Sequence, residues 1–345
     1  MSTEEKAWRP VADLAMLRLR AALLQRIRAF FAERDVLEVE TPLLASTTTT
    51  EPHLASLQVH PGPFGAPLDN RQPPTNPIEE DHQGTSPRAA PLFLQTSPES
   101  FMKRLLAAGS GPIYQLCKAF REEEVGRCHN PEFTILEWYR PGFDRAALMD
   151  EIDALLRATL GIGPGARIGY AEAFRRHAGL DPFRAPLSTL QDHTRGLGLT
   201  PEDAHSLHRD DCLDLILSRV VQPALGPGPV FLSGFPASQA AMARLAPDDP
   251  AVAQRFELFV DGIELANGYH ELGDAREQRA RFLADGAKRR ERRLPAVPMD
   301  ERLLGALAHG MPDCAGVALG VDRLVMLAGG ARRLDSVLAF PFSRV

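Results

Sequence analysis

The most regular pattern of apolar and polar positions lies in the middle of the chain. An apolar run from Ile113 to Phe120 leads into Arg121 and a polar turn, and an apolar and aromatic run follows from Phe133 to Tyr139. Two such runs joined by a short polar segment are typical of an antiparallel hairpin. Alternation along the first strand puts Arg121 and Glu123 on one face. The hairpin would then offer a guanidinium suited to phosphate beside a carboxylate, although a salt-bridged surface hairpin fits the same pattern.

Apolar residues at helical spacing predict helices before and after this hairpin. The first helix is interleaved with arginines, which fits a solvated face or, as an alternative, contact with RNA or a membrane. The second has Ser97 at its cap, Pro98 at its first position and Glu99 in its first turn, and Gly109 ends it. Helices are predicted over residues 14–31, 97–109, 144–160 and 274–293, after Gly320, and in a helical region that extends to about residue 225.

Strands are predicted where short apolar runs are bounded by turn residues. Asp261-Gly262 between two such runs is a strong hairpin signal. The glycines of 161–169 miss the dinucleotide-binding spacing, so that segment is predicted to be a loop. The remaining strand predictions are 36–44, broken at Pro42, and 92–96, 256–260, 263–266 and 314–320, with a strand and turn over 229–240. Strands and helices do not alternate regularly, which favours an α+β fold with a mainly antiparallel sheet flanked by helices.

Composition narrows the class of protein. The 345 residues are 44% hydrophobic and 24% charged, with a net charge of −6, which argues against a general nucleic-acid binder. The four cysteines lack metal-ligand spacing and are expected to be reduced thiols. No apolar run is long enough for a membrane span and the N-terminus lacks a signal-peptide pattern, so a cytoplasmic location is expected. Residues 61–91 are rich in proline and poor in apolar residues, which predicts a mobile surface insertion that is dispensable for adenylation.

Several charged and aromatic residues could together form a site for ATP and an amino cation. Neither common nucleotide-binding loop is present. Two arginines, Arg121 and Arg323, stand at the ends of apolar strands, and three glutamates, Glu257, Glu264 and Glu271, are spaced seven apart across one hairpin. Two carboxylates together with phosphates are a common way to hold Mg²⁺, and a remaining carboxylate could receive an ammonium group. Taken singly, each of these residues also fits a surface acid, a core aromatic or a capping residue.

The same segments resemble three motifs of the class II aminoacyl-tRNA synthetases. LEVETP is similar to motif 1, FREEE with HNPEFTILEWY to motif 2, and GVALGVDR to motif 3. FELFVDGIELANGYHEL and TSPESFMKRL look like the catalytic core of lysyl-tRNA synthetase. The resemblance extends from about Leu14 to Phe342, apart from the insertion, and the expected organisation is therefore a single catalytic domain over residues 1–345.

A narrower resemblance is to the bacterial elongation factor P lysyltransferases, which are paralogues of this core. At most a dozen residues precede the core, so no anticodon-binding domain is expected. Ala318 occupies a motif 3 position where lysyl-tRNA synthetases have glycine, and its methyl group would reshape the pocket in favour of (R)-β-lysine over lysine. The resemblance implies ATP and Mg²⁺ as cofactors, activation of (R)-β-lysine or lysine as an adenylate, and transfer to a lysine of elongation factor P. It also implies a homodimer built on the 14–44 region, with no stable nucleic-acid or membrane partner.

Site residues follow from the resemblance position by position. Arg121 and Arg323 would be catalytic, holding the α- and γ-phosphates. Glu99 and Glu271 would pair with the side-chain ammonium of the substrate. The ATP site would comprise Arg121, Glu122, Glu123, His129, Asn130, Phe133, Glu264, Leu265, Gly320 and Arg323. The amino-acid site would comprise Ser97, Pro98, Glu99, Tyr139, Asn267, Tyr269, Glu271 and Ala318, and Mg²⁺ would bind Glu257 and Glu264.

Some positions depart from the synthetase pattern. Glu122 replaces an asparagine, and Phe101 replaces a tyrosine of lysyl-tRNA synthetases; both changes weaken an assignment to lysine more than an assignment to adenylation. A truncated synthetase that charges tRNA or another amine, and a non-catalytic regulatory paralogue, are the alternatives. The basic run from Lys288 to Arg293 fits either a docking surface for an acidic acceptor protein or a solvated helix end.

Overall fold

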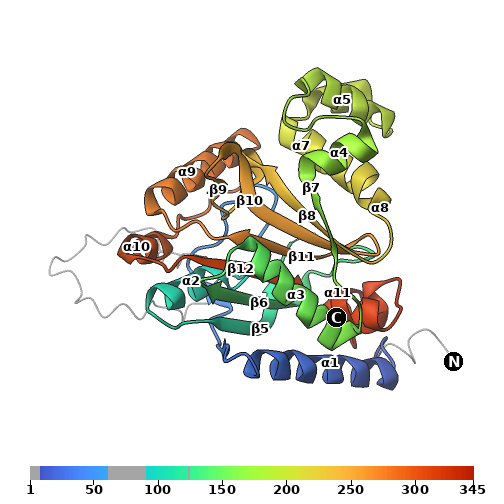
Figure 1. Ribbon diagram of the computed structural model, residues 1–345, viewed down its shortest axis with the longest axis vertical. Coiled ribbons are helices and arrows are strands. Elements are labelled where there is room, and N and C mark those ends of the chain that lie inside the picture. The colour runs from blue at the N-terminus through green and yellow to red at the C-terminus, as the bar shows by residue number, and fades with distance from the viewer. Residues whose placement is uncertain (1–7, 61–90, 123–124) are drawn as a thin grey trace, which may run out of the picture.

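The computed structural model describes residues 8–60, 91–122 and 125–345. The main feature of this part of the chain is a nine-stranded sheet (Figure 1). All neighbouring strands are antiparallel except the outermost pairs β1–β5 and β7–β8, so the predicted α+β fold with a mainly antiparallel sheet is confirmed. In sheet order the strands are β1 (Leu37–Glu38), β5 (Ile113–Phe120), β6 (Glu132–Pro141), β12 (Cys314–Gly320), β11 (Ile263–His270), β10 (Asp249–Val260), β8 (Pro229–Pro236) and β7 (Ala166–Gly169), with β9 (Leu245–Ala246) paired to β10.

The chain also forms a small second sheet. It contains β2 (Leu44–Ala45), β4 (Leu92–Leu94) and β3 (Gln58–Val59) in that order. The strand predicted over 36–44 is therefore two short strands, and β1 and β2 belong to different sheets. Pro42 lies between them, where the lack of an amide donor prevents one continuous ladder.

Helices pack around the large sheet (Figure 1). The long helices α1 and α3 and the short α11 contribute to the main hydrophobic core together with β6, β10 and β12. Helix α10 lies against α2 and α9, and it was not predicted from the sequence. These helices are α1 (Leu14–Ala32), α2 (Glu99–Ala107), α3 (Arg145–Leu160), α9 (Ala275–Glu291), α10 (Glu301–His309) and α11 (Val321–Ala328).

A second group of helices forms a lobe at the β7 and β8 edge of the sheet, and it has its own core around Tyr170 and Phe174. Its members are α4 (Tyr170–Ala178), α5 (Leu187–Gly196), α6 (Pro201–Ser206), α7 (Arg209–Ile216), the π-helical turn Leu217–Val221 and α8 (Gln222–Ala224). The predicted loop at 161–169 is wrong from Ala166 onwards, because that segment pairs in parallel with β8. Short 3₁₀ turns occur at Ala237–Gln239, Leu334–Val337 and Phe342–Arg344.

The predicted helices and hairpins begin and turn for local reasons. Asp13, Asp144 and Asp274 cap α1, α3 and α9 by accepting backbone amides of the first turn. Asp261 and Gly262 both have positive φ (51° and 72°), as a tight two-residue hairpin turn requires. The β10–β11 hairpin is confirmed, although both strands are longer than predicted.

Aromatic side chains join the first helix to the central hairpin. The ring of Phe31 stacks on Tyr114 at 4.4 Å between centroids and meets Trp138 edge-on at 5.4 Å. All three residues are buried, and burying each large apolar side chain contributes about 1.5–3 kcal/mol. This core fixes the central hairpin against α1.

No helix in the described ranges combines the length and apolar character needed to cross a membrane. The predicted insertion, apart from Pro91, lies outside the described residues.

Candidate active site

One face of the large sheet forms the floor of a cavity of about 440 Å³. Residues directly opposite one another on neighbouring strands share a face. Across β10, β11, β12 and β6 one such row reads Glu257, Asn267, Ala318 and Glu137, and the adjacent row reads Arg255, Tyr269, Gly316 and Tyr139. All eight residues line the cavity. Residues that are far apart in the sequence therefore meet because the strand registers align them.

A fully buried lysine lies behind one end of the cavity, in contact with two carboxylates of the cavity wall. Lys103 Nζ lies 2.8 Å from Glu99 Oε1, one helical turn away, and 2.6 Å from Glu271 Oε2. Burial alone would lower the pKa of Lys103, but the charges of Glu271 and Glu99 raise it above its ordinary value. Burial raises the pKa of Glu271 to about 7, although Lys103 acts in the opposite direction. The two carboxylates predicted to receive a substrate ammonium thus already share one internal cation.

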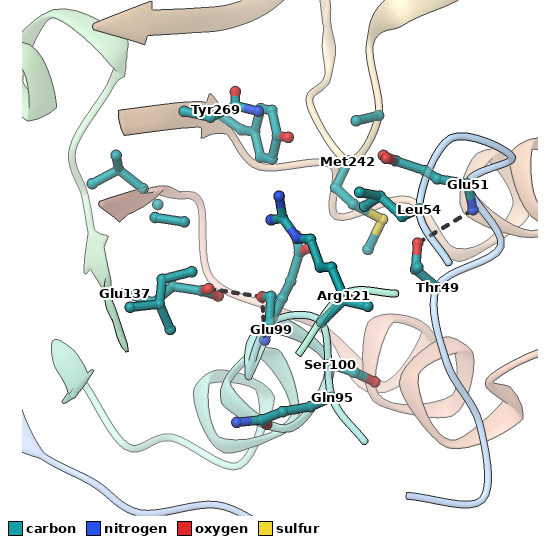
Figure 2. A pocket seen from close by; sticks show the side chains of 18 of the residues that line it. Thr49, Glu51, Leu54, Gln95, Glu99, Ser100, Arg121, Glu137, Met242 and Tyr269 are labelled. Carbon is teal, nitrogen blue, oxygen red and sulfur yellow. Dashed lines mark hydrogen bonds between the residues drawn. The ribbon is translucent and has the colours of Figure 1, made fainter. Parts of the chain in front are cut away.

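Glu137 adds a third carboxylate to this end of the cavity. Ser97 donates a 2.7 Å hydrogen bond to its Oε2, and the Tyr139 hydroxyl donates a 2.8 Å bond to its Oε1. Burial, with Glu99 as the next cause, raises the pKa of Glu137 to about 8. Figure 2 shows Glu137 directed towards Glu99 across the cavity. With three carboxylates and one lysine, this end attracts cations.

Gly316 leaves room for two of these groups. A Cβ atom at this position would lie 2.4 Å from the Tyr139 ring and 2.5 Å from Glu271 Oε1. Both distances are shorter than any ordinary carbon contact, so a side chain here would displace Tyr139 or Glu271. The absence of a side chain at residue 316 thus keeps the carboxylate end of the cavity intact.

Arginines and an aromatic ring define the other end of the cavity. The guanidinium carbon of Arg121 lies 5.0 Å from the centre of the Phe133 ring. Arg323 donates to the backbone oxygens of Glu264 (2.7 Å) and Cys128 (3.3 Å), and its Nη2 lies 2.8 Å from His129 Nε2. The structure therefore brings together the arginines, the ring and the turn that the motif resemblance assigned to ATP.

A buried aspartate locks this end of the cavity to the scaffold. Asp322 accepts hydrogen bonds from the Thr134 amide (2.8 Å) and from Arg20 Nη1 (2.5 Å). Arg20 also donates to the Thr134 hydroxyl at 2.7 Å. Asp322 and Thr134 are the sequence neighbours of Arg323 and Phe133. Helix α1 consequently helps to position both predicted ATP residues through Arg20, whose interleaved spacing had suggested only a solvated face or a charged partner.

Glu257 and Glu264 stand where the sequence predicted a magnesium site. Burial raises the pKa of Glu257 to about 7; Arg255 opposes the rise and the charge of Glu264 adds to it. Arg255 Nη2 lies 2.5 Å from Glu257 Oε1, and its Nε donates to Asn267. Two mutually repelling carboxylates suit an ion that also takes phosphate oxygens as ligands. Among the described side chains, no cluster of three or more histidine, cysteine or acidic groups has metal-binding geometry.

Most predicted site residues line this single cavity. Asn130 is among them, but its side chain is engaged with the Glu132 carbonyl and the Phe342 amide, so it holds the C-terminal segment in place. Pro98 and Glu122 are not part of the cavity wall, and Glu123 lies outside the described residues. The wall includes the following predicted residues: Ser97, Glu99, Arg121, His129, Asn130, Phe133, Tyr139, Glu257, Glu264, Leu265, Asn267, Tyr269, Glu271, Ala318, Gly320 and Arg323.

Several charged residues of the cavity wall or its surroundings were not assigned from the sequence. Lys103 follows Glu99 by four residues on a helix, and Arg255 precedes Glu257 by two on a strand, so spacing could have indicated both contacts. Glu137 stands inside the aromatic run of the central hairpin, where a carboxylate is unusual. Glu51 carried no local signal, because only the tertiary fold brings its loop to the cavity.

The cations of the basic run at the end of α9 differ in exposure: some are buried or paired, and the others are exposed to solvent. Arg289 is buried and donates to the carbonyls of Pro295 (3.0 Å) and Glu51 (3.1 Å). Arg292 pairs with Asp211 at 2.9 Å. The interpretation as a solvated helix end is wrong for Arg289, and a docking surface could use only the remaining exposed cations, Lys288, Arg290 and Arg293.

Sequence comparison identifies the relatives of this chain. The family described as tRNA synthetases class II (D, K and N) matches residues 9–344. The chain belongs to this family. Membership of the class II synthetases implies that ATP is a substrate. A Vibrio cholerae serotype O1 protein named elongation factor P–(R)-β-lysine ligase is 50% identical over 339 residues, which are 98% of each chain. A Salmonella paratyphi B protein of the same name is 47% identical over 343 residues, or 99% of each chain. The predicted resemblance to class II synthetases is therefore confirmed.

Proposed function

We propose that this chain is an ATP-dependent ligase that activates (R)-β-lysine as an adenylate and transfers it to a lysine of elongation factor P. The observation that carries the proposal is one cavity with a carboxylate-rich end and an arginine-rich end. The names of relatives that match it at 47–50% identity over nearly its full length support the choice of donor and acceptor. A tRNA-charging enzyme and a non-catalytic paralogue receive no comparable support.

The carboxylate end suits an amino acid with a cationic side chain. Glu99, Glu137 and Glu271 carry up to three negative charges, and Lys103 supplies one positive charge. The negative charge that Lys103 leaves uncompensated can be balanced by ammonium groups of the substrate. Ala318 lies between Asn267 and Glu137 in the sheet register, so its methyl group stands on the cavity floor and limits how deeply the substrate backbone can sit.

The arginine end suits the nucleotide. Arg121 and Arg323 would hold the phosphates, and Phe133 would offer its ring to the adenine. Glu257 and Glu264 would hold Mg²⁺, which when bound would neutralise phosphate charge. Such an ion would also offset the repulsion from Glu264, which adds to the effect of burial in raising the pKa of Glu257.

Chemistry at the junction of the two ends needs little proton transfer at first. The substrate carboxylate is already ionised, so its oxygen attacks the α-phosphorus directly and pyrophosphate departs. The fixed positive charges of Arg121 and Arg323 are placed to stabilise the charge that develops in this step. The carbonyl carbon of the resulting adenylate is then attacked by the amine of the acceptor, and AMP leaves.

A homodimer is part of the proposal, as is action in the cytoplasm, where translation factors work. Large apolar side chains are exposed in the motif 1 region: Leu14 is 70% exposed, Leu37 57% and Leu44 42%. Leu37 also belongs to β1, the edge strand of the large sheet. Apolar residues at an open sheet edge favour burial against a second copy.

Amino-acid-dependent exchange of pyrophosphate into ATP tests the adenylation step. We expect exchange with (R)-β-lysine or lysine and little with norleucine, which has the length of lysine but no side-chain ammonium. Losing a desolvated ion pair costs about 3–5 kcal/mol, or about 10²-fold or more in rate. Equal exchange with norleucine would refute the role of the carboxylate end.

A further inference from the structure

One carboxylate of the cavity wall has no task in the adenylation step. Every other acid that lines the cavity has a side-chain partner in the described part of the chain. These engaged acids are Glu99 and Glu271 with Lys103, Glu137 with Ser97, Glu257 with Arg255, Glu264 with Arg323, Asp285 with Thr50, Asp300 with Ser100, and Asp322 with Arg20. Glu51 lines the same cavity, and within the described ranges its carboxylate has no hydrogen-bond or ion-pair partner.

The loop that carries Glu51 is fastened on both sides. Thr50 donates to Asp285 of α9 at 2.9 Å, and Arg289 of α9 donates to the carbonyl of Glu51 at 3.1 Å. Further along the loop, the carbonyl of Ala55 accepts the amide of Glu122 at 2.9 Å, next to the end of β5. The backbone at Glu51 is therefore held between α9 and the central hairpin while its side chain extends into the cavity (Figure 2).

The charges around Glu51 come from both ends of the cavity. The charges of four side chains act on its carboxyl group: Arg255 of β10, Glu99 of α2, Asp285 of α9, and Arg121 at the end of β5. Arg121 belongs to the arginine end and Glu99 to the carboxylate end, so Glu51 lines the cavity within the influence of both ends, between which the acyl-phosphate bond of the adenylate would form. Burial, reinforced by Glu99 and Asp285 and opposed by the two arginines, raises its pKa.

We propose that Glu51 is the general base of the transfer step and takes a proton from the incoming acceptor ammonium. This inference rests on the proposed function. The acceptor lysine arrives protonated and cannot attack until it loses that proton. Glu51 accepts it, the freed nitrogen lone pair forms the bond to the carbonyl carbon, and the bond from that carbon to the AMP oxygen breaks. The departing phosphate takes the second proton of the nitrogen, and the products are an amide and AMP.

A carboxylate suits this role better than it suits nucleotide binding. A negative group at the junction repels the α-phosphate, so it does not assist adenylation, whereas it attracts an ammonium that approaches after pyrophosphate has left. A base is most effective when its pKa lies near the working pH, and the environment of Glu51 moves its pKa in that direction.

The test compares Glu51→Gln, Glu51→Asp and the control Thr50→Val, which loosens the same loop and keeps every carboxylate. For each protein, pyrophosphate exchange with (R)-β-lysine and transfer of the β-lysyl group to elongation factor P are measured. We expect the ratio of transfer to exchange to fall by about 10²-fold or more in Glu51→Gln, since general bases contribute about that much. Glu51→Asp should recover part of the ratio, and Thr50→Val should keep the wild-type ratio.

Hydroxylamine separates a base from a merely structural residue, because it is neutral at the assay pH and needs no deprotonation before it attacks. The rate of hydroxamate formation in Glu51→Gln should therefore fall no more than the rate of pyrophosphate exchange falls in the same variant. A loss of hydroxamate that equals the loss of transfer, or an unchanged ratio of transfer to exchange, would overturn the proposal. If the wild-type enzyme leaves elongation factor P unmodified, the proposed function fails, and the same comparison with Nα-acetyl-lysine amide as the acceptor still decides the role of Glu51.

Discussion

Lys103 offers the sharpest test of how the carboxylate end of the cavity is built. Its Nζ atom is fully buried and lies 2.8 Å from Glu99 and 2.6 Å from Glu271, which is itself only 1% exposed. Lys103→Met keeps the length of the side chain but removes the charge, which leaves two neighbouring carboxylates without their cation. Removing one partner of a buried ion pair costs about 3–5 kcal/mol, and we expect a loss of that size in the free energy of unfolding.

Urea unfolding followed by circular dichroism measures this loss. The matched control is Lys118→Met, because Lys118 also pairs with a glutamate, Glu132, at 3.0 Å but is 44% exposed. Exposed ion pairs contribute about 0–1 kcal/mol, so the control should hardly change stability. The effect of Lys103→Met should shrink as the pH falls below about 7, because burial raises the pKa of Glu271 to about 7 and this carboxylate then takes up a proton. Equal effects of the two substitutions, or a loss for Lys103→Met that does not depend on pH, would refute this account.

Three further predictions concern the same scaffold. Burial raises the pKa of Glu137 to about 8, so this carboxyl keeps its proton in the folded protein at pH values where the unfolded chain has lost it. The folded protein should therefore lose stability as the pH rises from about 5 to 8. Glu137→Gln should flatten that decline in the melting temperature of the ligand-free protein. Gly316→Ala should raise the KM for the amino acid in pyrophosphate exchange far more than the KM for ATP, because the new methyl group displaces Tyr139 or Glu271; equal changes in both constants would contradict this. Light scattering should show a dimer at micromolar concentration and Leu37→Glu should weaken it, whereas a fully active monomer would exclude the proposed interface.

The central hairpin could be predicted from the sequence because its information is local. Apolar runs, a polar turn and the Asp261-Gly262 dipeptide each specify geometry within a few residues, and the structure has hairpins at both places. Most of the residues that the motif resemblance identified line the cavity. The motifs could be recognised without knowing how the strands align in the sheet, because the spacing of their residues lies within short stretches of sequence.

Contacts between distant segments could not be predicted in this way. The segment 161–169 is rich in glycine and proline, which by itself predicts a loop. Residues from Ala166 onwards form a strand because they pair in parallel with β8. The loop of Glu51 reaches the cavity through Arg289, which is 238 residues away and was interpreted as part of a basic surface. Lys103 is the intermediate case, since helical spacing predicts its contact with Glu99 but only the fold reveals the contact with Glu271.

The central claim is that one cavity joins a cationic amino acid to a protein amine at the expense of ATP. Intact-mass measurement of elongation factor P, incubated with this enzyme, ATP, Mg²⁺ and either (R)-β-lysine or lysine, tests it most directly. We predict a mass increase of one lysyl group on a single lysine, dependent on ATP and larger with (R)-β-lysine. An unchanged mass of elongation factor P, with an enzyme that still exchanges pyrophosphate in response to lysine, would contradict it.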